Sequence, residues 1–519
     1  MADKTVCVVS AEAMIPELGP FACGANQRGG LGDLFGHMLE GFIKKGIHVI
    51  PITYFYPRDW QTGEMVDYNN TPARCHYGLD VDIYWQRRSV PIFTIDRAGA
   101  RVYGINDPEA GIIYPDLPKK IRQAAFFGRA VHALLKKLNE RPEIVWCQEW
   151  PTMPVIPNLR DDPFFKNTKY IFTLHTSVHD ALDSIPNELY NDFALDEKYR
   201  FAFLRDGVLD PTLAGVRLAD LVTGVSEEHG GEVRKMYPEY AANITGLRNG
   251  TSRSSLLSPR IKALQHTNPY SLWTAHLGDR AELHEEVRKE TGILMDPERP
   301  DIVLFRREAD YKNRRPMFEP NIHAICAPRG KPLNDGRKGL GANVIFGGVA
   351  HENYKAGQEN MELYRQWMQD QNLKGKFVYL PFYSAAWRTL TVRGCDIHVE
   401  CPQPRCEACG TSWMLAQLNG ILNLATLGGG HKGHSKLADP QTGEGDTLFI
   451  EPYNPETLYL QLDKACGWFY DWTLNQNDWW PRLKMNNYLR GEEVDITHMI
   501  EKYDELCFKP LLAQVNKAA

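Results

Sequence analysis

The 519-residue sequence lacks any apolar run of about 18 residues, so it predicts no membrane-spanning helix. Its first residues show no secretory signal and no cleavage site, which favours a cytoplasmic protein. Positive charge is not in excess either, because 59 Lys and Arg stand against 65 Asp and Glu, for a net charge of −6. Nucleic acid and anionic membranes attract basic surfaces, so we expect neither as a partner.

A disulfide framework is also not indicated. The 11 cysteines are an odd number scattered along a long chain, which predicts reduced thiols in a cytoplasm. Cys406 and Cys409 form one CxxC pair, with Cys395 and Cys401 nearby, but a second CxxC is missing. Structural zinc normally requires paired knuckles, so we expect no metal site, and the role of these four cysteines stays open.

Short apolar strands alternate with helical patterns along both halves of the chain. Strands are predicted at residues 5–10, 48–53, 144–147, 169–174 and 221–225, and then at 302–305, 344–346, 377–380, 397–400, 421–424 and 447–450. Between them lie helical patterns, such as Phe127, Val131, Leu134 and Leu138, which recur at spacings of three and four. This alternation predicts βαβ units and parallel sheets buried on both faces.

The expected fold class is therefore α/β, with two Rossmann-like domains facing each other across a cleft. We expect an N-terminal domain at residues 1–260, a second domain at residues 261–480, and a helical segment at residues 481–519 that packs back on the domains. Ligands of such folds bind at the carboxyl ends of the strands, where helix N-termini offer N–H groups to anions. A phosphate-containing ligand in the cleft is the expectation from the fold alone.

A glycine-rich turn, Gly29-Gly30-Leu31-Gly32, lies between the first strand and a helix. Glycines let the backbone approach a ligand closely, and the following helix N-terminus favours negative charge. The same turn could equally be a tight connection, since it is neither a GxGxxG fingerprint nor a P-loop.

A basic run, Arg306, Arg307 and Lys312, follows the strand at residues 302–305. Arginine offers a bidentate fork and lysine a point charge, a usual pairing for phosphate oxygens. The alternative is a solvated, charged helix start.

Glu407 stands before Gly410, Thr411 and Ser412, which open an apolar helix after the strand at residues 397–400. A carboxylate beside free helix N–H groups suits a sugar held by its hydroxyls while its phosphate meets the helix end; the alternative is a simple helix cap. His175 ends another strand, where loops carry function, although a histidine there is also often a hydrogen-bonded structural residue.

Taken in order, these segments resemble the α-glucan phosphorylases and, more distantly, the glycogen and starch synthases, over roughly residues 6–460. The turn RGGLGD at residues 28–33 resembles the family's glycine loop, and residues 172–176 resemble the strand that ends in its active-site histidine. Arg307 and Lys312 fall on the donor-phosphate clamp "R…EYK", and EACGTS at residues 407–412 resembles "EASGTS".

This resemblance implies a GT-B fold, with the N-terminal domain on the acceptor side and the second domain binding the donor. It implies that Arg307 and Lys312 neutralise the leaving phosphate, helped by the helix N-termini at Gly29, Gly30 and Leu31 and at Gly410, Thr411 and Ser412. It also implies that His175 and Glu407 contact sugar hydroxyls.

One departure from the phosphorylase pattern is decisive for the expected chemistry. Leu415 occupies the position of the lysine that forms the imine with pyridoxal phosphate, so we expect no such cofactor. Trp413 replaces a small residue nearby, and residues 442–454 resemble a segment of nucleotide-sugar transferases. We therefore expect a retaining glycosyltransferase that moves a hexosyl unit, with glucose favoured, from a nucleotide diphosphate sugar to a glucan or other hydroxyl acceptor.

Two other functions stay open at this point. One is a sugar phosphorylase that works without pyridoxal phosphate, since Arg307 and Lys312 serve inorganic phosphate equally well. The other is a catalytically inactive, phosphorylase-like subunit that binds sugar or nucleotide. The sequence does not identify the base, the sugar, the acceptor, the physiological direction or whether the chain forms a homo-oligomer.

Overall fold

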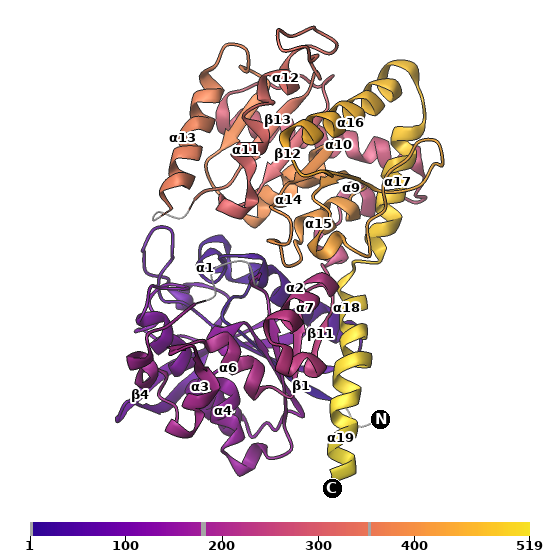
Figure 1. The fold of residues 1–519 in the computed structure, drawn as a ribbon. Coiled ribbons are helices and arrows are strands. Elements are labelled where there is room, and N and C mark those ends of the chain that lie inside the picture. The colour runs from indigo at the N-terminus through magenta and orange to yellow at the C-terminus, as the bar shows by residue number, and fades with distance from the viewer. Residues whose placement is uncertain (1–3, 178–182, 351–353, 519) are drawn as a thin grey trace. The chain divides into compact units, whose positions relative to one another are not determined.

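The computed structural model describes residues 4–177, 183–350 and 354–518 (Figure 1). The chain divides into two compact units: unit 1 comprises Met1–Ser252 and Ile496–Ala519, and unit 2 comprises Arg253–Asp495. Boundaries were predicted at residues 260 and 480, whereas the units change at residues 252 and 495. The first boundary lies earlier because Leu256 and Ile261, on two short helices, are buried in hydrophobic clusters of unit 2.

Within the described residues, unit 1 contains a nine-stranded sheet in the order β11-β10-β7-β6-β1-β2-β5-β4-β3. Its strands are β1 (Thr5–Ser10), β2 (His48–Tyr54), β3 (Arg74–Ile83), β4 (Gln86–Arg97), β5 (Ala100–Ile105), β6 (Ile144–Gln148), β7 (Lys169–Leu174), β10 (Leu221–Gly224) and β11 (Ile244–Gly246). The strands from β11 to β5 are parallel, whereas β4 runs antiparallel to both of its neighbours, β5 and β3. The five strands predicted in this half are confirmed, and β3, β4, β5 and β11 are additional to them.

Helices cover both faces of this sheet. They are α1 (Pro20–Ala25), α2 (Gly30–Lys44), α3 (Lys119–Leu138), α4 (Val155–Arg160), α5 (Arg200–Phe203), α6 (Pro211–Leu218) and α7 (Glu227–Met236), with a short hairpin of β8 (Leu204–Arg205) and β9 (Val208–Leu209). Helices α3, α4 and α6 pack on one face (Figure 1), and α2 packs on the other.

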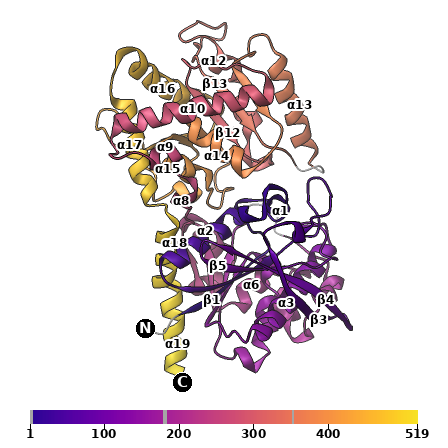
Figure 2. The same ribbon diagram turned by 180° about the vertical axis from the view of Figure 1, so that it is seen from behind.

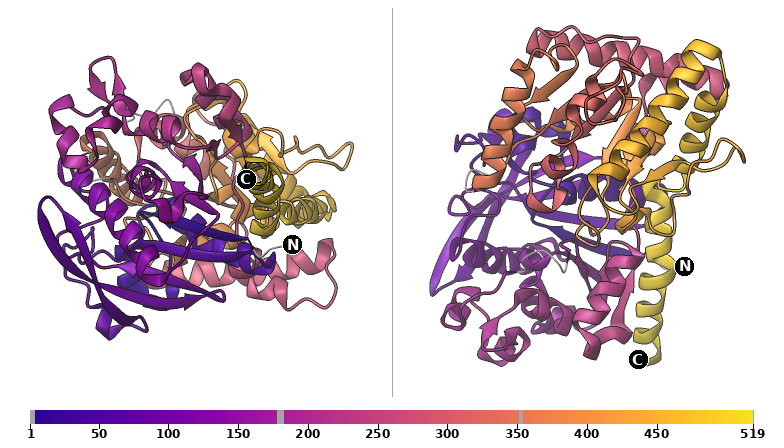
Figure 3. Two further views of the ribbon diagram at one scale, coloured as in Figure 1. Left: turned by 90° about the horizontal axis from the view of Figure 1, so that it is seen from below. Right: turned by 45° about the horizontal axis from the view of Figure 1, so that its top comes forward.

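The chain from Ile496 onward belongs to unit 1, whereas residues 481–495 of the predicted C-terminal segment belong to unit 2. The part from Ile496 forms α18 (Ile496–Tyr503), one π-helical turn, Asp504–Phe508, and α19 (Lys509–Ala518), a continuous rod that can be followed in Figure 3. Tyr503 packs its ring 4.2 Å from that of Trp146, and Phe508 stacks on Phe42 at 6.2 Å between centroids. These buried aromatic contacts complete the hydrophobic core on the α2 face of the sheet.

Unit 2 contains a six-stranded, fully parallel sheet in the order β14-β13-β12-β15-β16-β17 among the described residues. Its strands are β12 (Asp301–Phe305), β13 (Asn343–Gly347), β14 (Phe377–Leu380), β15 (Ile397–Glu400), β16 (Leu422–Ala425) and β17 (Thr447–Phe449). All six correspond to predicted strands. The order reverses at β12, which is typical of a doubly wound fold.

The helices of unit 2 are α8 (Arg253–Leu256), α9 (Pro259–Lys262), α10 (Pro269–Thr291), α11 (Arg314–Phe318), α12 (Ile322–Cys326), α13 (Lys355–Gln369), α14 (Ala385–Gly394), α15 (Ser412–Leu418), α16 (Pro455–Asn475) and α17 (Trp479–Glu492). Side chains of α11, α12, α13 and α16 share one hydrophobic cluster, and those of α10, α14 and α15 share the cluster on the other face, where Figure 2 shows α10 lying across the unit. Both faces of the sheet are therefore buried.

Candidate functional site

Two cations and one carboxylate meet at the carboxyl edge of the unit 2 sheet. Arg306 follows β12 directly, Lys312 ends a short 3₁₀ turn after it, and Glu407 lies in the loop after β15. Because β12 and β15 are neighbouring parallel strands, their following loops emerge side by side. Arg306 Nη2 donates to Glu407 Oε2 at 2.5 Å, and Lys312 Nζ donates to the same oxygen.

The electrostatics of this cluster keep its groups charged. Burial is the largest influence on Glu407 and acts to raise its pKa, but Lys312 and Arg306 together outweigh it, so the pKa lies below its usual value. For Arg306, burial acts to lower the pKa, but Glu407 and Glu400 reverse the effect and raise it. Glu407 and Arg306 are therefore both charged at neutral pH.

Arg307 lies outside this ion-paired cluster in the structure. Its side chain is exposed, whereas that of the preceding residue, Arg306, is largely buried and faces Glu407. The structure thus brings Lys312 and Glu407 together as the sequence predicts, but the arginine beside them is Arg306. A role for Arg307 in binding the donor phosphate stays a prediction.

The predicted helix start at Gly410, Thr411 and Ser412 opens α15. Gly410 has φ 69°, a left-handed conformation that favours glycine, and Thr411 is the N-cap residue without a side-chain hydrogen bond to the helix. The Ser412 hydroxyl donates instead to Glu400 Oε1. The first N–H groups of α15 are therefore not capped by Thr411 and point to the edge that carries Glu407.

Glu400 was not among the predicted site residues, although it belongs to the same cluster. It ends β15, is 2% exposed, and its Oε2 lies 3.7 Å from His431 Nε2. Burial acts to raise its pKa, but Arg306 and His431 lower it further than burial raises it. Glu400, Glu407, Arg405 and His431 line one small pocket, whose rim includes Gly428 and Gly429. A glutamate at the end of a predicted strand, shortly before the segment that carries Glu407, was the signal available in the sequence.

The position of the phosphorylase lysine lies in the core of unit 2. Leu415 is 1% exposed and belongs to the hydrophobic cluster that includes Phe305 and Val392. Trp413 is fully buried and contacts the rings of His431 and His434, with centroids 4.5 and 5.2 Å away. A leucine cannot form an imine. The rings of Trp413, His431 and His434 pack together at the start of α15.

In unit 1, the glycine turn is organised by a buried carboxylate. Glu12 Oε2 accepts hydrogen bonds from the backbone N–H groups of Arg28 at 3.0 Å and Gly29 at 2.6 Å. Helix α2 begins at the next residue, Gly30, and its N-cap residue provides no side-chain cap. The N–H groups of Gly30 and Leu31 thus stand at the start of a 15-residue helix, the arrangement that favours an anion.

His175 lies at the carboxyl end of β7, at the same edge of this sheet. Its Nε2 lies 2.8 Å from Gln148 Oε1, a carbonyl oxygen that can only accept, so this nitrogen carries the proton. Burial, with His229 nearby, lowers the pKa of His175 to about 3. The imidazole is therefore neutral at physiological pH and presents Nδ1 as an acceptor.

Glu149 holds the loop that carries His175. It is 8% exposed, and its Oε2 accepts from the backbone N–H groups of His175 at 2.7 Å and Thr176 at 2.9 Å. Its own backbone has φ 66° and ψ 163°, a region that only glycine normally occupies. Burial raises the pKa of Glu149, although the N–H donors of His175 and Thr176 oppose the rise. Strain of this kind clusters at functional sites, and the sequence shows no sign of it.

Within residues 4–177, 183–350 and 354–518, no three His, Cys, Asp or Glu side chains gather in a way that could hold a metal ion. Across those same ranges, no helix has the length and apolar character needed to cross a bilayer. The described residues include all eleven cysteines, and no disulfide bond forms among them.

Comparison with known proteins gives three kinds of similarity. Residues 6–249 match the family described as starch synthase catalytic domain. The chain is 23% identical to a glycogen synthase of Lachnospira eligens, covering 97% of this chain and 99% of that protein. It is also 23% identical to a glycogen synthase of Desulfitobacterium hafniense, covering 79% of this chain and 77% of that protein.

Among solved structures, the catalytic domain of starch synthase IV from Arabidopsis thaliana, bound to ADP and acarbose, matches with a TM-score of 0.76 at 16% identity and covers 99% of both chains. At this identity the structural match shows the fold, which is GT-B. These relatives are synthases, and the nearer likeness to phosphorylases expected from the motifs stays a prediction. The family match, the full-length relative and the shared fold together show that this chain is a GT-B glycosyltransferase related to the glycogen synthases.

Proposed function

We propose that the chain transfers a glucosyl unit from a nucleotide diphosphate sugar to a hydroxyl group of a glucan, with retention of anomeric configuration. The observation that carries the proposal is the meeting of Arg306 and Lys312 on Glu407 at the carboxyl edge of a doubly wound sheet. Relatives named glycogen synthase, and the ADP in the Arabidopsis starch synthase structure, support a nucleotide sugar as the donor.

The cluster is suited to an exchange of partners when the donor binds. Lys312 and the neighbouring arginines donate hydrogen bonds to the diphosphate oxygens, and Glu407 is then available to accept from sugar hydroxyls. Glu400 and Glu407 balance Arg306 and Lys312, so the exposed Arg307 supplies the surplus positive charge that a diphosphate needs. Cations fixed where negative charge grows in the transition state are usually the largest catalytic contribution.

The other predicted residues have complementary roles in this proposal. The N–H groups of Gly410, Thr411 and Ser412 and those of Gly29, Gly30 and Leu31 stabilise negative charge on the leaving group. His175, neutral and fixed by Gln148, accepts a hydrogen bond from a sugar hydroxyl through Nδ1. Because the eleven cysteines are an odd number and form no disulfide bond within the described residues, we place the enzyme in a reducing cytoplasm.

Thermal-shift measurement with UDP-, ADP- and GDP-glucose tests donor binding first. A donor present at 100 times its Kd should raise stability by about 2.7 kcal/mol. For a unit of this size that is roughly 5–11 °C in Tm. The stabilising sugar is then used in a transfer assay with glycogen, and ¹H NMR of the new linkage gives its anomeric configuration.

Lys312→Ala tests whether the cluster around Glu407 is the catalytic site. Removing one donor aimed at transition-state charge should lower kcat by roughly 10²–10³. Near-normal turnover of this variant would show that the site is placed wrongly. Glucan synthesis from glucose 1-phosphate without any response to nucleotide sugars would show instead that the protein is a phosphorylase.

A further inference from the structure

The β3–β4 hairpin of unit 1 ends in a turn made of two aromatic residues. Tyr84 has φ 50° and Trp85 has φ 63°, so both adopt the left-handed conformation. Tight hairpin turns of this kind normally contain Asn-Gly or Asp-Gly, because a side chain there is strained. Each aromatic residue in this conformation costs about 1–2 kcal/mol. Strain held at a surface turn indicates a function for the residues that carry it.

The two rings differ in how they are held. The Tyr84 hydroxyl donates to the backbone oxygen of Asp192, whose side chain accepts from Arg122 at 3.2 Å, so the turn is fixed to the body of unit 1. Trp85, in contrast, is 106% exposed, with its indole ring fully in solvent. The hairpin therefore presents a rigidly mounted, uncovered aromatic ring.

The register of the sheet places this ring beyond the carboxyl edge of unit 1. Strand β4 pairs with β5 only from Ile92, opposite Ile105, the last residue of β5. The six residues from Gln86 to Pro91 continue past that edge with β3 alone. At the usual rise per residue this extension is about 20 Å long. The edge is the one at which β7 ends and His175 begins its loop.

We propose that the Tyr84–Trp85 turn is a docking site for the glucan, with the Trp85 ring stacked on the apolar face of a glucose unit. The identity of the ligand rests on the proposed function. Flanking the ring, Asp82 and Arg87 form an exposed bidentate pair at 2.8 and 2.9 Å, a planar polar group able to bond sugar hydroxyls.

The size of the site also favours a glucan over a protein partner. One tryptophan buries about 150–250 Å², whereas a stable protein interface needs about 800 Å² from each partner. A contact this small becomes effective when the ligand repeats, because each glucose unit of a branched polymer offers the same face and the local concentration is high. A polysaccharide meets that condition.

Affinity electrophoresis in native gels that contain glycogen tests the proposal with the full chain. Trp85→Gly, which suits the left-handed turn, should weaken retardation by glycogen about fivefold, or ~1 kcal/mol. Trp85→Tyr retains a ring and should keep most of the binding. Phe201→Ala removes another exposed aromatic side chain of unit 1, 64% exposed on α5, and should bind as the wild type does.

Kinetics separate this site from the catalytic one. Trp85→Gly should raise KM for glycogen and leave the rate with a short malto-oligosaccharide unchanged. Equal retardation of Trp85→Gly and wild type overturns the proposal, as does a change in oligomeric state in place of a change in glycogen binding. If retardation depends on Trp85 while no nucleotide sugar is turned over, the proposed function fails and the docking site stands.

Discussion

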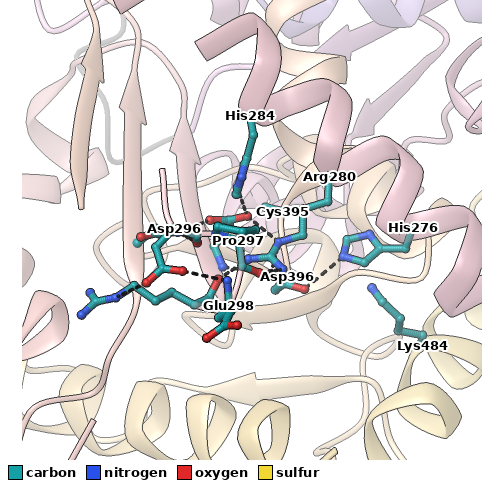
Figure 4. A network of polar contacts seen from close by, with 12 residues as sticks. His276, Arg280, His284, Asp296, Pro297, Glu298, Cys395, Asp396 and Lys484 are labelled. Atoms are coloured by element: carbon teal, nitrogen blue, oxygen red, sulfur yellow. Dashed lines mark hydrogen bonds and ion pairs between the residues drawn. The ribbon is translucent and has the colours of Figure 1, made fainter. Parts of the chain in front are cut away.

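Arg280→Met should destabilise unit 2 by about 3–5 kcal/mol, because it removes the cation that bridges two buried carboxylates. The Arg280 side chain is 6% exposed and lies 2.7 Å from Asp301 and 3.1 Å from Asp396, which are both fully buried. Figure 4 shows it extending from α10 between His276 and His284. His276 Nε2 bonds Asp396 at 3.0 Å, and His284 Nε2 bonds Asp301 at 2.7 Å.

The loss can be measured as a change in Tm by differential scanning calorimetry. For a unit of this size it corresponds to roughly 6–20 °C. Arg288→Met is the matched control: the residue lies on the same helix, but its ion pair with Glu285 is exposed, so the variant should lose less than about 1 kcal/mol. Equal Tm values for the Arg280 and Arg288 variants would refute the reasoning.

The pH dependence of stability gives a second, independent test of the role of Arg280. Burial acts to raise the pKa values of Asp301 and Asp396, but Arg280 and the histidines lower them below the usual range. In the wild type their contribution is therefore complete above about pH 4 and is lost as pH falls through the lowered values. Without Arg280, burial dominates and raises both pKa values. The deficit of Arg280→Met should then shrink between pH 7 and pH 5, and a constant deficit would contradict this account.

Three further predictions concern the site and the packing. Arg307→Ala should lower kcat/KM without changing Tm, because its side chain is exposed. Arg306→Ala should lower both kcat/KM and Tm, because it leaves buried carboxylates without their ion-pair partner. Wild-type kinetics for Arg307→Ala would show that Arg306, and not Arg307, binds the donor phosphate. His175→Asn should reduce kcat but keep the shape of the pH–rate profile from pH 6 to 8, since the pKa of His175 is about 3. If the wild-type profile has an inflection near pH 6.5 that the variant lacks, this reasoning is wrong. Gly36→Ala should cost about 1–3 kcal/mol in urea denaturation, because its Cβ would meet a backbone oxygen at 2.5 Å, while Gly24→Ala, with nothing within 4 Å, should not.

The parallel strands were predictable because each is a short apolar run buried on both faces. The antiparallel strand β3 was missed although Leu79, Val81 and Ile83 alternate with polar residues, a pattern that indicates a half-buried strand. Helix α10 was not singled out for a different reason. Its buried face includes His276, Asp279 and Arg280, so apolar periodicity is nearly absent along it.

The candidate site could be predicted where the type and order of the residues identify it, as for Lys312 and Glu407. It was not predictable where geometry decides. The spacing of the clamp selects Arg307, but the backbone after β12 turns the side chain of Arg306 toward Glu407. The strained φ of Glu149 leaves no trace in the sequence. The motifs used for recognition are shared by phosphorylases and synthases, so they identify the superfamily better than the nearer relative.

The return of the chain to unit 1 at Ile496 has a consequence for biosynthesis. The core around Trp146 is closed by Tyr503 and Phe508, which leave the ribosome only after all of unit 2 has been made. During synthesis, the apolar face of the first 252 residues therefore stays uncovered until the last residues are made, and by then unit 2 is already able to fold. A truncation before Tyr503 would therefore leave the core around Trp146 uncovered, although all of residues 1–252 would be present.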